Sequence, residues 1–111
     1  MSEVKITADG ALCCPCCCDS HMQETYLHHG VVTVYNRREN ADSVALTQVS
    51  SGQGTIEIVP SAWSGNPSAR RDGVVIRFVC ENCDETSELT IAQHKGQTLL
   101  GWRVAVKQQV S

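Results

Sequence analysis

The segment VVIRFVCENC, residues 74–83, joins a strong strand signal to a pair of cysteines. Side chains alternate between two faces along extended backbone, and here one face is wholly apolar while the other carries the arginine. Cys80 and Cys83 follow with the C-x-x-C spacing that lets one tight turn offer two sulfurs to one metal. The segment therefore predicts a β-strand that ends in a metal-binding turn.

A second cysteine pair lies far upstream, in Cys14-Pro15-Cys16-Cys17. Cys14 and Cys17 have the same spacing, and a proline follows the first of them, as in many zinc knuckles. The two pairs supply four thiolates, which is the full coordination shell of a tetrahedral structural zinc ion. We therefore expect one Zn²⁺ bound by Cys14, Cys17, Cys80 and Cys83. Iron held by the same four sulfurs would give the same sequence pattern.

The upstream cluster CCPCCC leaves the choice of ligands open. Cys13 and Cys16 also have the C-x-x-C spacing. Cys18 stands after the second cysteine, where zinc knuckles usually carry a glycine because the backbone turns left-handed there. If Cys14 and Cys17 are the ligands, Cys13, Cys16 and Cys18 are small side chains around a crowded turn. Their alternative role is that of reactive thiols.

The other apolar segments are short and rich in β-branched residues, which predicts strands throughout. Turn-forming residues between two of them, residues 50–54, predict a hairpin, and residues 95–97 predict another turn. Residues 60–73 predict a long irregular loop. The expected strands are Val4–Ile6, Tyr26–Tyr35, Val44–Val49, Thr55–Val59, Val74–Cys80, Ser87–His94 and Thr98–Lys107.

The last three expected strands follow one another closely and predict a meander. In the final strand we expect Leu100, Trp102, Val104 and Val106 to form the core face, because they alternate with a more polar set. The fold prediction is therefore all-β: an antiparallel meander or small sandwich with zinc-ribbon knuckles.

The length of 111 residues predicts one zinc-binding β domain spanning residues 1–111. No segment approaches the roughly 20 apolar residues that a membrane span needs. The first residues lack the basic and then apolar run of a secretory signal, which predicts a cytoplasmic protein. In a reducing cytoplasm, seven cysteines indicate a metal site rather than disulfides. The formal net charge of -3 disfavours non-specific phosphate binding as the main role.

The loop at residues 60–73 carries the best ligand-binding signal outside the cysteines. Arg70 and Arg71 offer guanidinium groups that suit phosphate or carboxylate, and Trp63 offers a ring on which a nucleobase could stack. One interpretation is a nucleic-acid contact. The other is a solvated loop in which Asp72 is the charge partner of the arginines.

The histidines suggest a catalytic or second metal site only weakly. His28 and His29 are adjacent, so on a strand they face opposite sides, and no pattern of carboxylates accompanies them or His94. We expect these three residues to be structural histidines at strand ends.

The paired cysteines resemble those of zinc ribbons, in which such knuckles sit on hairpins, although here a β-rich insertion separates the two pairs. The whole chain also resembles a group of small bacterial and phage-borne proteins with no assigned activity. That second resemblance rests on Tyr26-Leu27-His28-His29, on Asn66-Pro67-Ser68 with Arg70-Arg71 and Gly73, and on Ile91-Ala92-Gln93-His94-Lys95-Gly96. Both resemblances imply the zinc site and no particular substrate.

The sequence lacks the motifs of zinc deaminases, zinc peptidases, serine hydrolases and phosphate-binding loops. We therefore expect a non-enzymatic, zinc-stabilised binding or regulatory module whose partner is a protein. Two alternatives stay open. One is a nucleic-acid-binding zinc ribbon that uses the Arg70-Arg71 loop, and the other is a thiol or metal enzyme.

Overall fold

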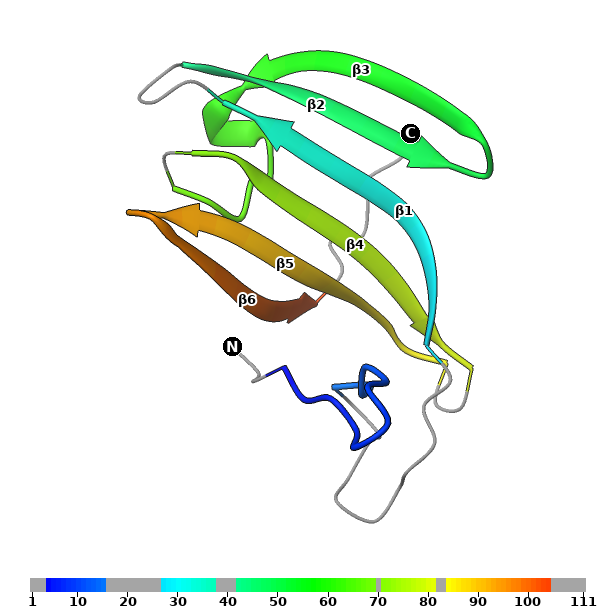
Figure 1. Ribbon diagram of the computed structural model, residues 1–111. Coiled ribbons are helices and arrows are strands. Elements are labelled where there is room, and N and C mark those ends of the chain that lie inside the picture. The colour runs from blue at the N-terminus through cyan, green and yellow to red at the C-terminus, as the bar shows by residue number, and fades with distance from the viewer. Residues whose placement is uncertain (1–3, 16–26, 38–41, 70, 82–83, 105–111) are drawn as a thin grey trace.

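The computed structural model describes residues 4–15, 27–37, 42–69, 71–81 and 84–104. In these residues, six antiparallel strands form one sheet in the order β3-β2-β1-β4-β5-β6 (Figure 1). The all-β prediction is confirmed, but the described strands lie in one sheet and not in two stacked sheets. The strands are β1 (Leu27–Asn36), β2 (Ser43–Ser50), β3 (Gln53–Pro60), β4 (Gly73–Cys80), β5 (Thr86–His94) and β6 (Gln97–Val104).

Two tight hairpins fix the register of the outer strands. Ser51 and Gly52 connect β2 to β3 with φ of 51° and 81°, and Lys95 and Gly96 connect β5 to β6 with φ of 49° and 80°. Positive φ at both central residues defines the turn whose twist matches that of paired strands. The hairpin and the turn predicted at these places are confirmed, as is the β4-β5-β6 meander.

The connection from β3 to β4 has to cross β2 and β1, because those two strands lie between them in the sheet. It begins with a short 3-10 helix, η1 (Ser61–Trp63), and continues as the irregular loop that the sequence predicts. We call residues 61–72 the crossing loop. Its Ser68 hydroxyl donates a hydrogen bond to the Gln93 carbonyl at 2.8 Å, and its Gly65 carbonyl accepts one from Arg103 Nη1 at 2.8 Å. These bonds hold the loop against one side of the sheet.

The strand registers divide the sheet into two faces of different chemistry. The face under the crossing loop, called the loop face, carries the charged side chains of the strand centres. The opposite face, called the uncharged face, has no Asp, Glu, Lys or Arg on any described strand. Its larger apolar side chains are Val32, Val34, Val49, Ile56, Ile58, Val74, Ile76, Phe78, Leu89, Ile91, Leu100, Trp102 and Val104.

The buried core cluster lies on the loop face and consists of Tyr35, Val44 and Val75, with Leu46 packed against it. The core prediction for the last strand is only partly right. Trp102 is 3% exposed and meets Phe78 edge to face, with the two ring centroids 5.9 Å apart.

Leu100 and Val104 were expected beside Trp102 in the core, but they are 56% and 83% exposed, and Val106 lies outside the described residues. Both residues lie on β6, an edge strand that has a neighbour on one side only among the described strands, whereas Trp102 on the same strand packs against Phe78.

Candidate functional site

The downstream cysteine pair lies where β4 ends. Cys80 is 1% exposed, its backbone N–H donates to the Glu85 carbonyl at 3.0 Å, and its carbonyl accepts from the Asp84 N–H at 2.8 Å. Asp84, which directly follows Cys83, has φ of 63° and so lies in the left-handed region. This is the position at which zinc knuckles usually carry glycine. The left-handed backbone at Asp84 therefore agrees with the predicted zinc knuckle. Cys83 itself lies outside the described residues.

The upstream pair follows a small hairpin that stands apart from the six-stranded sheet. Ile6 pairs with Leu12, and the Cys13 N–H donates to the Lys5 carbonyl at 2.9 Å. The opening strand expected at Val4–Ile6 is therefore reduced to a single bridge. Cys14 directly follows this hairpin and is 3% exposed. Cys16, Cys17 and Cys18 lie outside the described part of the chain.

Sheet topology places the start of β1 beside Cys80. Leu27 begins β1 and is the register partner of Cys80, at the end of β4 (Figure 1). Within the residues described, no group of three or more His, Cys, Asp or Glu side chains could hold a metal. Two of the four expected ligands, Cys17 and Cys83, are not among those residues. The zinc site thus stays a prediction, with two buried cysteines that suit a thiolate site.

His94 does not come together with the adjacent His28 and His29. His28 pairs with Val79 near one end of β4, whereas His94 lies beyond the other end of that strand. His29 is the register partner of Phe78, so it faces the side opposite to His28, as predicted. His28 Nε2 lies 2.6 Å from Glu81 Oε2, and both side chains are about two-thirds exposed. An exposed pair of this kind contributes little to stability.

The residues predicted for nucleic-acid contact are also separated. Trp63 is 83% exposed and lines a cavity on the loop face. Arg71 lines a different cavity of about 280 Å³ together with Arg37 and Asp72. Asp72 Oδ1 accepts a hydrogen bond from the Arg37 N–H at 2.7 Å. Arg70 lies outside the described residues, so the structure places only one of the predicted arginines, and that one is not on the cavity that Trp63 lines.

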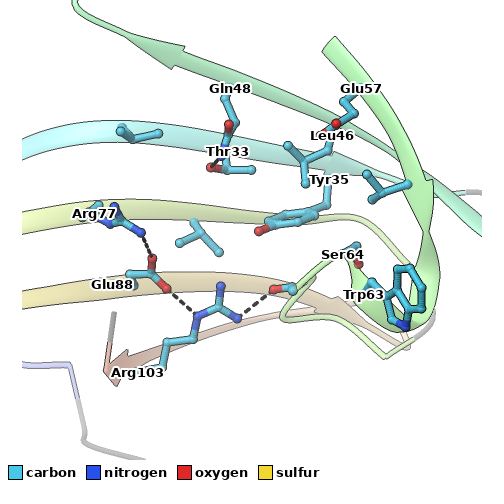
Figure 2. Close-up of a pocket in the computed structure, with 14 residues that line it drawn as sticks. Thr33, Tyr35, Leu46, Gln48, Glu57, Trp63, Ser64, Arg77, Glu88 and Arg103 are labelled. Carbon is cyan, nitrogen blue, oxygen red and sulfur yellow. Dashed lines mark hydrogen bonds and ion pairs between the residues drawn. The ribbon is translucent and has the colours of Figure 1, made fainter. Parts of the chain in front are cut away.

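Sequence reasoning missed a charged cluster on the loop face. Glu88 is buried, with Oε2 accepting from Arg77 Nη2 at 3.0 Å and Oε1 accepting from Arg103 Nε at 2.8 Å. Figure 2 shows Glu88 between the two guanidinium groups, with the Tyr35 hydroxyl directed toward them. The signal was present in the sequence: Arg77 and Arg103 each stand between apolar residues in a segment with strand-like alternation.

Burial raises the pKa of the Tyr35 phenol, while the positive charge of Arg103 and its hydrogen bond lower it less strongly. Tyr35 therefore keeps its proton at neutral pH and remains able to donate a hydrogen bond. The charged cluster and this phenol form one wall of the cavity that Trp63 also lines.

No helix within the described residues is long and apolar enough to cross a membrane. Comparisons with protein-family models, with curated proteins and with solved structures found no match to this chain.

Proposed function

We propose that this chain is a non-enzymatic, zinc-stabilised binding module and that its protein partner docks on the uncharged face of the sheet. One observation carries the proposal: all the charged side chains of the strand centres lie on the loop face, and the opposite face has no Asp, Glu, Lys or Arg on any described strand.

Apolar side chains on the uncharged face are accessible at both edges of the sheet. The five that are most exposed are Val49 at 49%, Ile56 at 75%, Ile58 at 65%, Leu100 at 56% and Val104 at 83%. Domains normally bury the apolar face of a sheet under a second layer. Large exposed apolar patches are typical of protein interfaces.

The partner that fits this face best is a second copy of the chain. Six strands spaced about 4.8 Å apart, each of about eight residues at 3.3 Å per residue, give a face of about 750 Å². A standard protein interface buries about 800 Å² on each partner. Two such faces packed together would form a sandwich about 10 Å thick at its centre, related by a two-fold axis. No like charges from the described strands would meet, because none of these strands places Asp, Glu, Lys or Arg on this face.

The zinc ion belongs to the same proposal, bound by Cys14, Cys17, Cys80 and Cys83 in a reducing, cytoplasmic setting. The burial of Cys14 and Cys80 and the left-handed backbone at Asp84 support this assignment. A zinc ion held there would tie the amino-terminal hairpin to the sheet as a structural cross-link.

Two neighbouring leucines on β6 provide a matched test of the interface. Leu99 and Leu100 are 47% and 56% exposed but point to opposite faces of the sheet. The zinc-loaded protein is expected to sediment as a dimer at about 100 µM in analytical ultracentrifugation. Leu100→Lys, which puts a charge on the uncharged face, should weaken self-association by about tenfold or more, whereas Leu99→Lys should leave it within about twofold.

A wild-type protein that sediments as a monomer at this concentration overturns the choice of a second copy as partner. Equal effects of the two lysine substitutions overturn the uncharged face as the interface. Circular dichroism of each variant establishes that the fold is retained, so that a lost dimer is not confused with an unfolded chain.

A further inference from the structure

The loop face contains a cavity of about 370 Å³ that the proposed protein interface does not use. Strands β1 to β4 form its floor, and the segment Trp63–Gly65 of the crossing loop forms its rim. Figure 2 shows the labelled side chains converging on this space, with Arg103 on one side and Glu57 on the other. The volume falls in the range of small-molecule sites, about 300–1,000 Å³.

The wall formed by β4, β5 and β6 has an excess of positive charge. Arg77 and Arg103 share a single carboxylate, that of Glu88, and both of its oxygens already accept a guanidinium donor. One positive charge is therefore not neutralised at this end of the cavity. The other acid of the lining, Glu57, lies across the cavity on the exposed edge strand β3.

Arg77 has donor capacity to spare. One of its terminal nitrogens is bonded to Glu88, while its Nε is buried and has no hydrogen-bond partner among the described residues. Because Nε is out of reach of solvent, the terminal nitrogen that is not bonded to Glu88 is the donor left for one more oxyanion on the cavity. Tyr35, whose phenol keeps its proton, adds a neutral donor on the same side.

The remaining lining is mixed: Thr33, Gln48 and Ser64 are polar, and the apolar residues offer a surface for an apolar body. Leu46, Val59 and Val75 line the cavity, and Trp63 stands at its rim with 83% of its surface exposed. A large aromatic side chain left this accessible beside a cavity offers a flat surface for stacking. Apolar lining with a few convergent polar groups is the usual composition of a ligand site.

We propose that this cavity binds a small aromatic monocarboxylate, with its carboxylate held by Arg77 and Tyr35 and its ring against Leu46, Val59 and Trp63. One excess positive charge matches one negative charge on the ligand. A dianionic phosphate fits less well, because its second charge would face the Glu88 carboxylate at close range. Arg103 acts as a positioning residue, since it already bonds Glu88, the Gly65 carbonyl and the Tyr35 hydroxyl.

Isothermal titration calorimetry with three related probes tests the chemical class of the ligand. 2-Naphthoate should bind with a Kd of about 1 mM or tighter. 2-Naphthamide, which has the same shape without the charge, should bind about tenfold more weakly or not measurably. 2-Naphthyl phosphate should also bind more weakly than the carboxylate. Equal binding of acid and amide, tighter binding of the phosphate, or no binding of the acid overturns the proposal.

Three substitutions test the location of the site. Trp63→Ala removes an exposed side chain that the fold does not need, and it should weaken naphthoate binding by about fivefold. Arg77→Lys keeps the charge opposite Glu88 but loses the planar donors, and should weaken binding by about tenfold. Arg71→Gln, in the separate cavity, should leave the affinity within about twofold. If binding survives both Trp63→Ala and Arg77→Lys unchanged, the ligand does not occupy this cavity.

The two tryptophans provide an internal control in the NMR spectrum. Naphthoate should shift the indole N–H signal of Trp63, on the loop-face cavity, and should leave that of Trp102, on the uncharged face, in place. A shift of the Trp102 signal alone would place the ligand on the opposite side and contradict the proposal. The result does not depend on whether the protein is a monomer or a dimer. The ligand proposal and the interface proposal are therefore tested independently.

Discussion

Arg77 and Glu88 face each other directly across β4 and β5, with Nη2 and Oε2 3.0 Å apart. Arg103 completes the contact from the next strand, so one buried carboxylate joins three neighbouring strands on the loop face. The strand register therefore determines which charged side chains line the cavity.

Glu88→Gln should destabilise the protein by about 1.5–3 kcal/mol. The amide is a weaker acceptor than the carboxylate, and two guanidinium groups would face each other without a compensating charge. Both arginine side chains are roughly one-third exposed, which keeps the loss below that of a fully buried pair.

Urea unfolding followed by circular dichroism measures this loss of stability. Glu57→Gln is the control, because Glu57 is an exposed acid on the same face of the sheet, and a change within about 0.5 kcal/mol is expected there. If the two variants unfold at the same urea concentration, the three-strand contact does not stabilise the fold.

Tyr35 should make folding stability fall at high pH. Burial raises the pKa of its phenol in the folded protein, whereas an unfolded tyrosine ionises at about pH 10. The unfolded state therefore loses its proton first, and the contribution of Tyr35 is complete below about pH 10 and declines as the pH rises toward the folded-state pKa.

Urea midpoints of the wild type and Tyr35→Phe between about pH 8 and pH 11 measure this effect. The substituted protein should lose less stability over the upper part of the range, because phenylalanine does not ionise. Parallel pH profiles for the two proteins would show that Tyr35 ionises equally well in the folded and unfolded states.

Removal of zinc should largely unfold the protein. Structural zinc contributes about 10–16 kcal/mol of apparent folding free energy in small zinc domains, whereas whole domains are stable by only about 5–15 kcal/mol. Elemental analysis should give one zinc per chain for the wild type, and none for Cys80→Ser.

Cys13→Ser and Cys14→Ser resolve the ligand choice in the upstream cluster. Zinc retained by the first and lost by the second assigns Cys14 and Cys17, and the reverse result assigns Cys13 and Cys16. A wild-type protein that is folded and free of metal contradicts the zinc proposal altogether.

Gly73→Ala should destabilise the contact between β4 and the crossing loop. An added Cβ would clash with Asn66 Oδ1 and lie 2.8 Å from Pro67 Cγ, closer than real Cβ atoms approach other carbon. Overpacking of this kind costs about 1–3 kcal/mol. Gly54→Ala on β3 is the matched control, because the nearest atom to its added Cβ is 3.6 Å away.

Thermal melting of the two variants provides the comparison. A melting temperature several degrees lower for Gly73→Ala and close to wild type for Gly54→Ala is expected for a domain of this size. Equal melting temperatures would mean that the crossing loop moves aside at little cost.

The sequence was sufficient to predict most of the strands. Alternation in residues 74–79 and turn residues at Ser51-Gly52 and Lys95-Gly96 are local signals, and local backbone preferences decide such elements. The pairing of β1 with β4 could not be predicted in this way. It joins segments distant in sequence, and many other strand orders satisfy the same local patterns.

The candidate sites show the same limit. Trp63 and Arg71 lie in one loop, so the sequence suggested one ligand surface, but the irregular backbone directs them to separate cavities. Glu88 and Arg77 occupy strands whose charged side chains suggest a solvated face. Only the strand register and the crossing loop reveal that the Glu88 carboxylate is buried. The end of β4 at Cys80 was predictable because the strand signal is local, whereas the zinc knuckle stays a prediction.

The strand order has a consequence for how the chain folds. Strands β1 to β3 and strands β4 to β6 are each built from neighbouring segments, and among the described strands only the β1–β4 pairing unites the two trios. Each three-stranded unit is therefore able to form early, because its strands pair through short loop closures. The pairing of β1 with β4 requires the closure of a much longer loop. The slowest step in folding should be the pairing of β1 with β4.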